Sequence, residues 1–255
     1  MVSDKIIECS LPIIYEIEPE DDQDFVEDYP YWTKGTCFIV DYEGQLFVVT
    51  AKHVIENQMK QCPNPERLLD QVRIVYDEKS KNFFPLCRYL RDESDEHIKD
   101  LAILKVANEI LKDEDKPFIK SLKLQNLDNL IRCPLSISPN SLLIVRGYPS
   151  QISSVDYEQC KIQTKAFVIH ARLSGSREKY LYMLNWLPKD IEIIEEELQD
   201  KFDPDGMSGS PVFSCKDFSL AGVLILGTRR NGNFISARIL YRMLKQIIDN
   251  TFIKE

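Results

Sequence analysis

The sequence predicts an all-β protein that ends in one amphipathic helix. Short runs rich in β-branched and aromatic residues recur between residues 36 and 236, separated by polar turns, which is typical of a β-barrel or a β-sandwich. The last run is followed by Ala237–Thr251, whose apolar residues fall on one helical stripe. We expect this helix to pack on the β-structure.

The first two strand candidates form a hairpin signal. Thr36–Val40 and Gln45–Thr50 flank the turn DYEG at 41–44, in which Gly44 can adopt a positive φ. The further strand candidates are Gln71–Tyr76, Phe83–Arg88, Leu101–Val106, Ser141–Gly147, Lys161–His170, Tyr180–Leu184, Gly209–Cys215, Ser219–Leu226 and Asn233–Ser236.

Helical patterning before the C-terminal segment is sparse. His53–Met59 predicts one or two turns, and Ala107–Lys112 is a weak candidate. Asp190–Lys201 has apolar residues at helical spacing and lies in the acidic segment Lys189–Asp205, which we interpret as a surface helix or a regulatory insertion. The acidic cluster at 16–28 predicts a solvated loop or mobile arm, with a regulatory or substrate-mimicking arm as the alternative.

Composition excludes several classes of protein. With 255 residues, of which 44% are hydrophobic, the chain can bury a core that needs no metal or disulfide. A net charge of -9 argues against nucleic-acid binding, and no apolar run approaches the length of a membrane span. The seven cysteines form no C-x-x-C pair and there are three histidines, so we expect no metal site.

The N-terminus and the cysteines together predict a cytoplasmic protein. The first residues lack the basic start and the apolar run of a secretory signal. An odd number of cysteines without such a signal indicates free thiols in a reducing compartment.

Three short segments contain residues of the types that are typical of catalytic sites. They are FVVTAKHVI around His53, KDLAILKV around Asp100 and DGMSGSPVF around Ser208. Each alone has a structural explanation: a core histidine, a capping aspartate and a tight turn. Gly206 and Gly209 flank the serine, however, and let the backbone turn so that N–H groups converge beside its hydroxyl, as an oxyanion hole requires.

The order His53, Asp100, Ser208 is the chain order of chymotrypsin-type enzymes and differs from that of subtilisin and the α/β-hydrolases. On these segments the sequence resembles the trypsin-like (chymotrypsin-fold) serine peptidases. The resemblance covers roughly 33–250 and rests on TAKH at 50–53, DLAI at 100–103, GMSGSP at 206–211, GTCFIV at 35–40, GVLILG at 222–227, and RGYP at 146–149, which is similar to a turn of bacterial members.

The resemblance implies a fold of two antiparallel six-stranded β-barrels with a C-terminal α-helix. The N-terminal barrel would span 1–130 and carry His53 and Asp100, and the C-terminal barrel with the helix would span 131–255 and carry Ser208. It also implies a serine endopeptidase of a bacterial intracellular type, acting on protein or peptide substrates without a cofactor. Such domains often accompany stress or defence modules. Because an unrestrained intracellular protease is harmful, we expect restraint by a regulatory protein partner, by a disordered catalytic loop or by a narrow substrate range.

The same resemblance assigns roles to individual residues. Ser208 would be the nucleophile, His53 the general base and Asp100 the group that orients the imidazole. The N–H groups of Gly206 and Ser208 would bind the oxyanion. The residues expected to flank the substrate pocket are Ile225, Leu226 and Gly227.

Three features leave alternatives open. Met207 stands where the digestive enzymes carry the aspartate that pairs with a new N-terminal ammonium, so we hypothesise that N-terminal insertion does not activate this protein. Ser210 replaces a glycine of the family motif. Arg229 and Arg230 follow the pocket strand and would either favour an acidic substrate residue or remain exposed.

Other functions compatible with the same motifs are a catalytically silent binding module (a pseudoprotease), a non-peptidase hydrolase with the same triad, and a structural β-protein with chance motifs. Of the other histidines, we interpret His97 as part of a solvated loop with Asp92 and Asp95, and His170 as structural.

Overall fold

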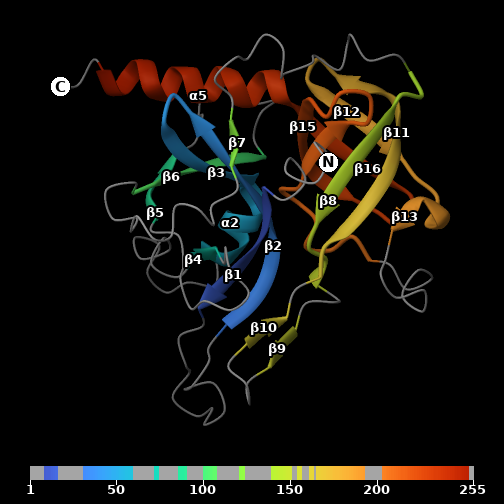
Figure 1. Ribbon diagram of the computed structural model, residues 1–255, viewed down its shortest axis with the longest axis horizontal. Coiled ribbons are helices and arrows are strands. Elements are labelled where there is room, and N and C mark those ends of the chain that lie inside the picture. Colours follow the sequence, from blue (N-terminus) through green and yellow to red (C-terminus); the bar gives the residue numbers. More distant parts are fainter. Residues whose placement is uncertain are drawn as a thin grey trace.

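The computed structural model of the chain consists of two β-sheets that lie side by side, with one long helix running across both (Figure 1). The all-β prediction with a C-terminal helix is therefore confirmed. The residues that the structure describes are 9–16, 31–59, 72–74, 86–90, 100–107, 121–123, 139–150, 154–156, 161–163, 165–192 and 203–252.

The first sheet is antiparallel along the path β4-β1-β2-β3-β6-β5, and β7 joins β2 in parallel. No pairing within the described residues joins β4 to β5, so closure into a barrel is not seen in this sheet. A short helix, α2 (Lys52–Met59), follows β3 directly. The strands are β1 (Ser10–Glu16), β2 (Tyr31–Tyr42), β3 (Gln45–Ala51), β4 (Val72–Ile74), β5 (Leu86–Leu90), β6 (Leu101–Val106) and β7 (Leu122–Lys123).

The predicted hairpin joins β2 and β3. Tyr42 pairs with Gln45, which leaves a two-residue loop of Glu43 and Gly44 with φ values of 53° and 79°. Two positive φ angles define the type I′ turn, whose twist matches that of the flanking strands. The Asp41 carboxylate accepts a hydrogen bond from the Gly44 N–H (3.1 Å), which supports the turn.

The second sheet closes into a barrel of six strands, in the order β12-β16-β15-β14-β8-β11 and back to β12. The six-stranded barrel predicted for this part of the chain is thus confirmed, and β13 adds to β11 outside the ring. The elements are β8 (Leu142–Gly147), β11 (Phe167–Glu178), β12 (Leu181–Asn185), the 3-10 helix η6 (Pro188–Asp190), β13 (Ile191–Glu192), β14 (Pro211–Ser214), β15 (Leu220–Gly227) and β16 (Asn231–Ser236), with β9 (Ser154–Asp156) and β10 (Lys161–Gln163) forming a separate pair.

The prediction of a helix over Asp190–Lys201 is wrong at its start. Ile191 and Glu192 form β13 and pair with Ile169 and Val168 of β11. Backbone pairing with a neighbouring strand satisfies these amides, so a tertiary contact overrides the local helical period. Residues 193–202 lie outside the described ranges, as do the domain boundary near 130 and most of the acidic cluster at 16–28.

Two further strand expectations need correction. The predicted strand Lys161–His170 is divided into β10 and β11, and β11 continues to Glu178 because it pairs with β8 on one side and β12 on the other. Strand β1 was not expected, since its apolar stretch is short and includes a proline. It is held between β2 and β4, so distant segments decide its conformation.

The C-terminal helix α5 (Ala237–Phe252) packs against both sheets and joins them through a shared apolar cluster. The Ser236 hydroxyl caps it by accepting a hydrogen bond from the Arg238 N–H (3.3 Å). Its Tyr241 ring meets the Tyr42 ring of β2 edge to face, with centroids 6.0 Å apart. One apolar cluster contains residues from the first sheet, the second sheet and the helix: Phe38, Val40, Phe47, Val49, Phe213, Val223, Ile235, Leu240, Met243 and Leu244.

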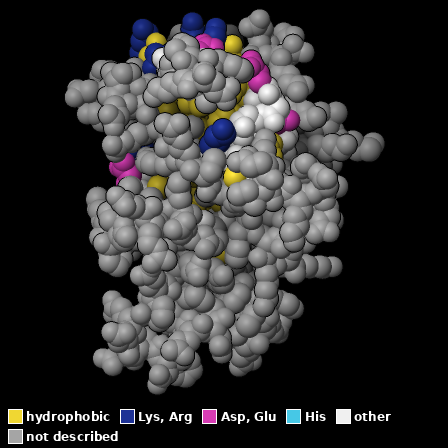
Figure 2. Space-filling view, turned by 90° about the vertical axis from the view of Figure 1, so that its left-hand side faces the viewer, with side chains coloured by type: hydrophobic (Ala, Val, Ile, Leu, Met, Phe, Trp, Pro, Cys, Tyr) yellow, Lys and Arg dark blue, Asp and Glu magenta, His cyan; other side chains and the backbone are white. Residues whose placement is uncertain are grey.

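The outer surface of this region carries charged side chains. Figure 2, which views the molecule from the side where α5 ends, shows Lys, Arg, Asp and Glu side chains gathered near the top, over that helix. Such a division between an apolar inner face and a charged outer face is what the sequence periodicity predicts. No helix among the described residues is long and apolar enough to cross a bilayer.

The three cysteines whose side chains are described are free thiols: Cys9, Cys37 and Cys215. Burial raises the pKa of Cys9 to about 12 and holds the pKa of Cys37 well above its ordinary value. Because the thiolate is the reactive form, we expect these two thiols to stay protonated at neutral pH and to act as small apolar core residues.

Leu240→Ala tests the role of α5. Leu240 is fully buried in the shared apolar cluster, so its truncation should lower the free energy of unfolding by about 2–5 kcal/mol. Urea denaturation followed by tryptophan fluorescence measures the change. Lys245→Ala, on the exposed face of the same helix, is the matched control and should leave the midpoint almost unchanged. Equal stability of both variants would contradict the proposed role of α5 in joining the sheets.

Candidate active site

Antiparallel pairing of β3 and β6 brings His53 and Asp100 together. Ala51, the last residue of β3, pairs with Leu101, the first residue of β6. His53 follows β3 in the first turn of α2, and Asp100 directly precedes β6. The two residues therefore lie at the same end of two neighbouring strands. The Asp100 carboxylate accepts the His53 backbone N–H (2.9 Å), which places a negative charge at the start of α2 where helix N–H groups lack partners.

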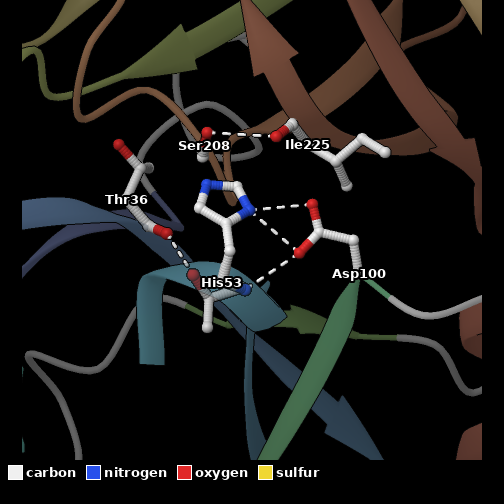
Figure 3. A network of polar contacts seen from close by, with 6 residues as sticks. Thr36, His53, Asp100, Ser208 and Ile225 are labelled. Carbon is white, nitrogen blue, oxygen red and sulfur yellow. Dashed lines mark hydrogen bonds and ion pairs between the residues drawn. The ribbon is translucent and has the colours of Figure 1, made fainter. Parts of the chain in front are cut away.

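The His53 side chain is oriented by the same carboxylate. Its Nδ1 lies 2.9 and 2.8 Å from the two carboxylate oxygens of Asp100. An ionised carboxylate can only accept, so Nδ1 carries the proton and Nε2 keeps a free lone pair. Figure 3 shows the imidazole between Asp100 and Ser208, with Nε2 turned toward the serine. The two side chains are 37% and 31% exposed, so a substrate can reach them.

Ser208 lies in a loop of the second barrel that makes two successive β-turns. The Met207 N–H donates to the Pro204 carbonyl (2.9 Å), and the Ser210 N–H donates to the Met207 carbonyl (3.0 Å). The third residue of each turn is a glycine with positive φ, Gly206 at 87° and Gly209 at 94°. Type II turns require this geometry, and glycine adopts it without strain. We call residues 204–210 the serine loop.

Gly209 permits the serine loop to approach the first sheet. A Cβ atom at this position would lie 2.0 Å from the Thr36 carbonyl oxygen and 2.3 Å from Thr50 Oγ1. The Thr36 N–H also donates to the Ser208 carbonyl (3.1 Å). The contact between the two sheets is therefore backbone against backbone, and a side chain here would separate Ser208 from His53.

The Ser208 hydroxyl donates to the Ile225 carbonyl (3.2 Å), as Figure 3 shows. Within the described part of the chain, no hydrogen bond joins this hydroxyl to His53 Nε2. The backbone N–H groups of Gly206 and Ser208 also find no acceptor among the described residues, although their neighbours do: the Met207 N–H bonds to Pro204 and the Gly209 N–H to the Leu224 carbonyl (2.7 Å). The hydroxyl therefore lies in a loop with two unpaired backbone donors.

Met207 is fully buried in the apolar interior of the second barrel. The cluster around it includes Val145, Phe167, Leu224 and Phe234. A carboxylate in its place would have apolar neighbours, which agrees with our hypothesis that no ion pair with an N-terminal ammonium forms here. Residues 1–8 lie outside the described ranges, so the hypothesis itself stays a prediction.

The expected pocket residues lie at the end of β15. The Ile225 carbonyl is next to Ser208, and Leu226 points outward with 53% of its surface exposed. Gly227 lies close to Pro204 of the serine loop: a Cβ at Gly227 would lie 2.9 Å from the Pro204 Cβ, so a side chain there would clash.

The buried Trp186 ring lies behind this strand pair. A Cβ at Gly232, the β16 partner of Gly227, would lie 2.8 Å from the edge of the ring. The Trp186 N–H and its indole Nε1 donate to the carbonyls of Arg230 (2.9 Å) and Arg229 (3.1 Å). The two arginine side chains are exposed.

One residue of the site, Thr36, was not recognised from the sequence, and one other candidate histidine lies elsewhere in the fold. His170 sits in β11 opposite Ile144, apart from the candidate triad, while His97, Asp92 and Asp95 lie outside the described residues. Thr36 was noted only as part of a strand motif. Its hydroxyl bonds to the carbonyl of Gly206, 170 positions away, and no local pattern signals such a contact.

Solved structures show the same fold. Kallikrein-related peptidase 10 aligns with a TM-score of 0.52 at 14% identity, covering 96% of this chain and 98% of that chain. An inactivated protease paralogue of the scabies mite aligns with a TM-score of 0.54 at 11% identity, covering 95% and 92%. No protein-family model and no curated protein sequence matches the chain. The fold is chymotrypsin-like.

Met207→Asp tests the apolar setting of the serine loop. A carboxylate there would be buried without a partner, so we expect the free energy of unfolding at pH 7 to fall by about 3–5 kcal/mol. Burial would raise the pKa of the new carboxyl, so the deficit should shrink as the pH is lowered from 7 to 4. Denaturation at both pH values, with Met207→Leu as the control, measures this. A stable Met207→Asp protein at pH 7 would mean that a cationic partner reaches the site.

Proposed function

We propose that this chain is a trypsin-like serine endopeptidase that cleaves peptide bonds through His53, Asp100 and Ser208 and a covalent acyl-enzyme. The observation that carries the proposal is the pair of contacts from His53 Nδ1 to the Asp100 carboxylate, which leave Nε2 facing Ser208. The backbone N–H groups of Gly206 and Ser208, which have no acceptor among the described residues, belong to the same loop as the serine. This combination of an oriented base, a nucleophile and free N–H groups suits acyl transfer. The chymotrypsin-like fold supports the proposal.

In the first half of the reaction, the Ser208 hydroxyl turns about its Cα–Cβ bond from the Ile225 carbonyl to His53 Nε2. Ser208 is partly exposed, and side chains at the surface make such rotations within nanoseconds. Oγ then attacks the substrate carbonyl carbon while its proton passes to Nε2. The N–H groups of Gly206 and Ser208 donate to the oxyanion that forms. Asp100 stabilises the imidazolium. When the C–N bond breaks, the leaving amine takes the proton from Nε2.

The second half of the reaction returns the protein to its starting state. A water molecule gives its proton to Nε2 and attacks the acyl carbon. The same two N–H groups hold the second oxyanion. The C–Oγ bond breaks, Ser208 Oγ takes the proton back from His53, and the carboxylic acid product leaves. No step requires a redox partner or a cofactor.

The substrate backbone would bind along the end of β15. From Leu224 to Gly227 this strand pairs with β16 on one side, while β14 pairs with it only as far as Val223. Among the described residues, no strand occupies the other edge beside Ile225, Leu226 and Gly227. An extended peptide could add there as a strand, which would bring its carbonyl to Ser208. The exposed Leu226 would contact substrate side chains.

A catalytically silent binding module is the alternative function. It is favoured by the Ser208 hydroxyl, which bonds to Ile225 and not to His53. One protein of the same fold is an inactivated protease paralogue, so the fold by itself does not imply activity. The intact set of three side chains favours the enzyme.

We further propose a cytoplasmic protease of the bacterial intracellular type, with a narrow substrate range or a regulatory partner, in a stress or defence system. Uncontrolled peptide hydrolysis would damage a cell. The division into domains 1–130 and 131–255 is proposed with it, since the first sheet ends before the second begins at β8.

Ser208→Ala and His53→Ala test the mechanism. Each should abolish covalent labelling by a fluorophosphonate and lower kcat for a peptide amide by roughly 10⁴- to 10⁶-fold, because residues of a triad act as a unit. Asp100→Asn should keep the fold and lower kcat about 10⁴-fold. Labelling followed by mass spectrometry, together with amide hydrolysis, gives both readouts.

Ser174→Ala is the matched control, because Ser174 is an exposed serine of β11 and should label and turn over like the wild type. Wild-type protein that neither labels nor cleaves would support the binding module. Ester turnover without amide cleavage would instead indicate a non-peptidase hydrolase.

The contact between Pro204 and Gly227 predicts a preference for small residues before the cleaved bond. Because Pro204 lies so close to Gly227, we expect little room for a substrate side chain between the serine loop and β15, so glycine, alanine or serine should be favoured. Cleavage of a peptide library by wild type and by Pro204→Ala measures this, and the variant should admit larger apolar residues. Enrichment of aspartate or glutamate would favour a role for Arg229 and Arg230 instead.

A further inference from the structure

The carbonyl groups of Asp205 to Ser208 in the serine loop all accept hydrogen bonds. Four consecutive peptide units run from Asp205 to Gly209, and each carbonyl oxygen accepts a hydrogen bond. The donors are the Ser150 N–H to Asp205 (2.8 Å), Thr36 Oγ1 to Gly206 (2.9 Å), the Ser210 N–H (3.0 Å) and Ser210 Oγ (2.6 Å) to Met207, and the Thr36 N–H to Ser208 (3.1 Å).

A held carbonyl also fixes the N–H of the same peptide unit. The peptide group is planar and trans, so its C=O and N–H point in opposite directions. The Asp205 carbonyl faces Ser150, which directs the Gly206 N–H the other way. The Met207 carbonyl faces Ser210, which directs the Ser208 N–H away from that residue. These are the two N–H groups without an acceptor, and they are the donors assigned to the oxyanion.

Ser210 contributes a side-chain bond at this point. It is fully buried, and its hydroxyl makes the shorter of the two bonds to the Met207 carbonyl. The adjacent strand leaves room for it only because Gly147 has no side chain: a Cβ there would lie 2.1 Å from Ser210 Oγ. The serine that departs from the family motif thus secures the peptide unit whose N–H belongs to the nucleophile.

Thr36, in the first sheet, donates hydrogen bonds to the two peptide units that flank the Met207–Ser208 unit. Its buried hydroxyl donates to the Gly206 carbonyl and accepts the Tyr148 N–H (2.8 Å), so both hydrogen-bonding functions are used. Its own N–H holds the Ser208 carbonyl. The peptide units on both sides of the Met207–Ser208 unit are therefore tied to β2, and rotation of that unit would break bonds to Thr36 as well as to Ser210.

We propose that Thr36 and Ser210 are positioning residues of the oxyanion hole, which hold the Gly206 and Ser208 N–H groups in place before substrate binds. This inference rests on the proposed function and extends it. The two hydroxyls do not touch the substrate. They act through carbonyl oxygens of the serine loop, and they need no proteolytic cleavage to do so. The hole is then a permanent part of the fold.

Thr36→Val and Ser210→Ala remove the hydroxyls at almost constant volume. Thr36→Ser is the conservative variant, because it keeps the hydroxyl and removes only the methyl group. Loss of a whole oxyanion donor costs roughly 100- to 1,000-fold in kcat, so loosening one should cost about 10- to 100-fold. We expect kcat for a peptide amide to fall by that factor with KM little changed.

Affinity for a peptide aldehyde, which adds to the serine to give a tetrahedral adduct, should fall in parallel, while affinity for the peptide carboxylate product should not. Thr36→Ser should recover most of both losses.

Ser236→Ala is the matched control for the loss of a buried hydroxyl. The Ser236 hydroxyl caps α5 and is not part of the serine loop, so the variant should be less stable yet keep the wild-type kcat and aldehyde affinity. Folded Thr36→Val and Ser210→Ala proteins with wild-type aldehyde affinity would overturn the positioning role while leaving the proposed function intact.

The amide resonances of Gly206 and Ser208 in ¹⁵N-labelled protein provide a readout that does not depend on activity. If the wild type neither labels nor binds the aldehyde, the proposed function fails. Shifted resonances in both variants would then still support the positioning role, and unshifted resonances would overturn it.

Discussion

The close approach of the serine loop to the first sheet is the constraint on which the candidate site depends. Gly209 lies so near the backbone of Thr36 that no side chain fits between them. Ser208 comes from one sheet and His53 from the other, so the separation of these two side chains is set by this contact and not by either sheet alone. A shift of about 1 Å in such an arrangement is enough to weaken catalysis severely.

The rest of the fold maintains that contact. Helix α5 and the apolar cluster beneath it join both sheets, and the Tyr42–Tyr241 pair adds a contact between β2 and the helix. Apolar burial is strong but has little directional preference. The hydrogen bonds from Thr36 to Gly206 and Ser208 are directional, because they form only when the two sheets take one relative position.

The serine loop is held by neutral groups. A buried carboxylate would have to be matched by a buried cation, and the desolvation of both charges offsets much of their attraction. Here Met207 fills the position with an apolar side chain, and hydroxyl and amide donors satisfy the carbonyl oxygens of Asp205 to Ser208. Such bonds are individually modest, but leaving a buried carbonyl without a partner is costly, so the set favours one conformation.

The sequence by itself determined the features that depend on near neighbours. Positive φ at Gly44, Gly206 and Gly209, the apolar stripe of α5 and the order of His53, Asp100 and Ser208 are all local or ordinal properties. The tertiary structure alone decided the rest. Strand pairing turned Ile191 and Glu192 into β13 against their helical period, and β1 formed between two distant strands. The partners of Thr36, the present hydrogen bond of the Ser208 hydroxyl and the contact of Pro204 with Gly227 depend on segments that are far apart in the chain, which no local pattern encodes.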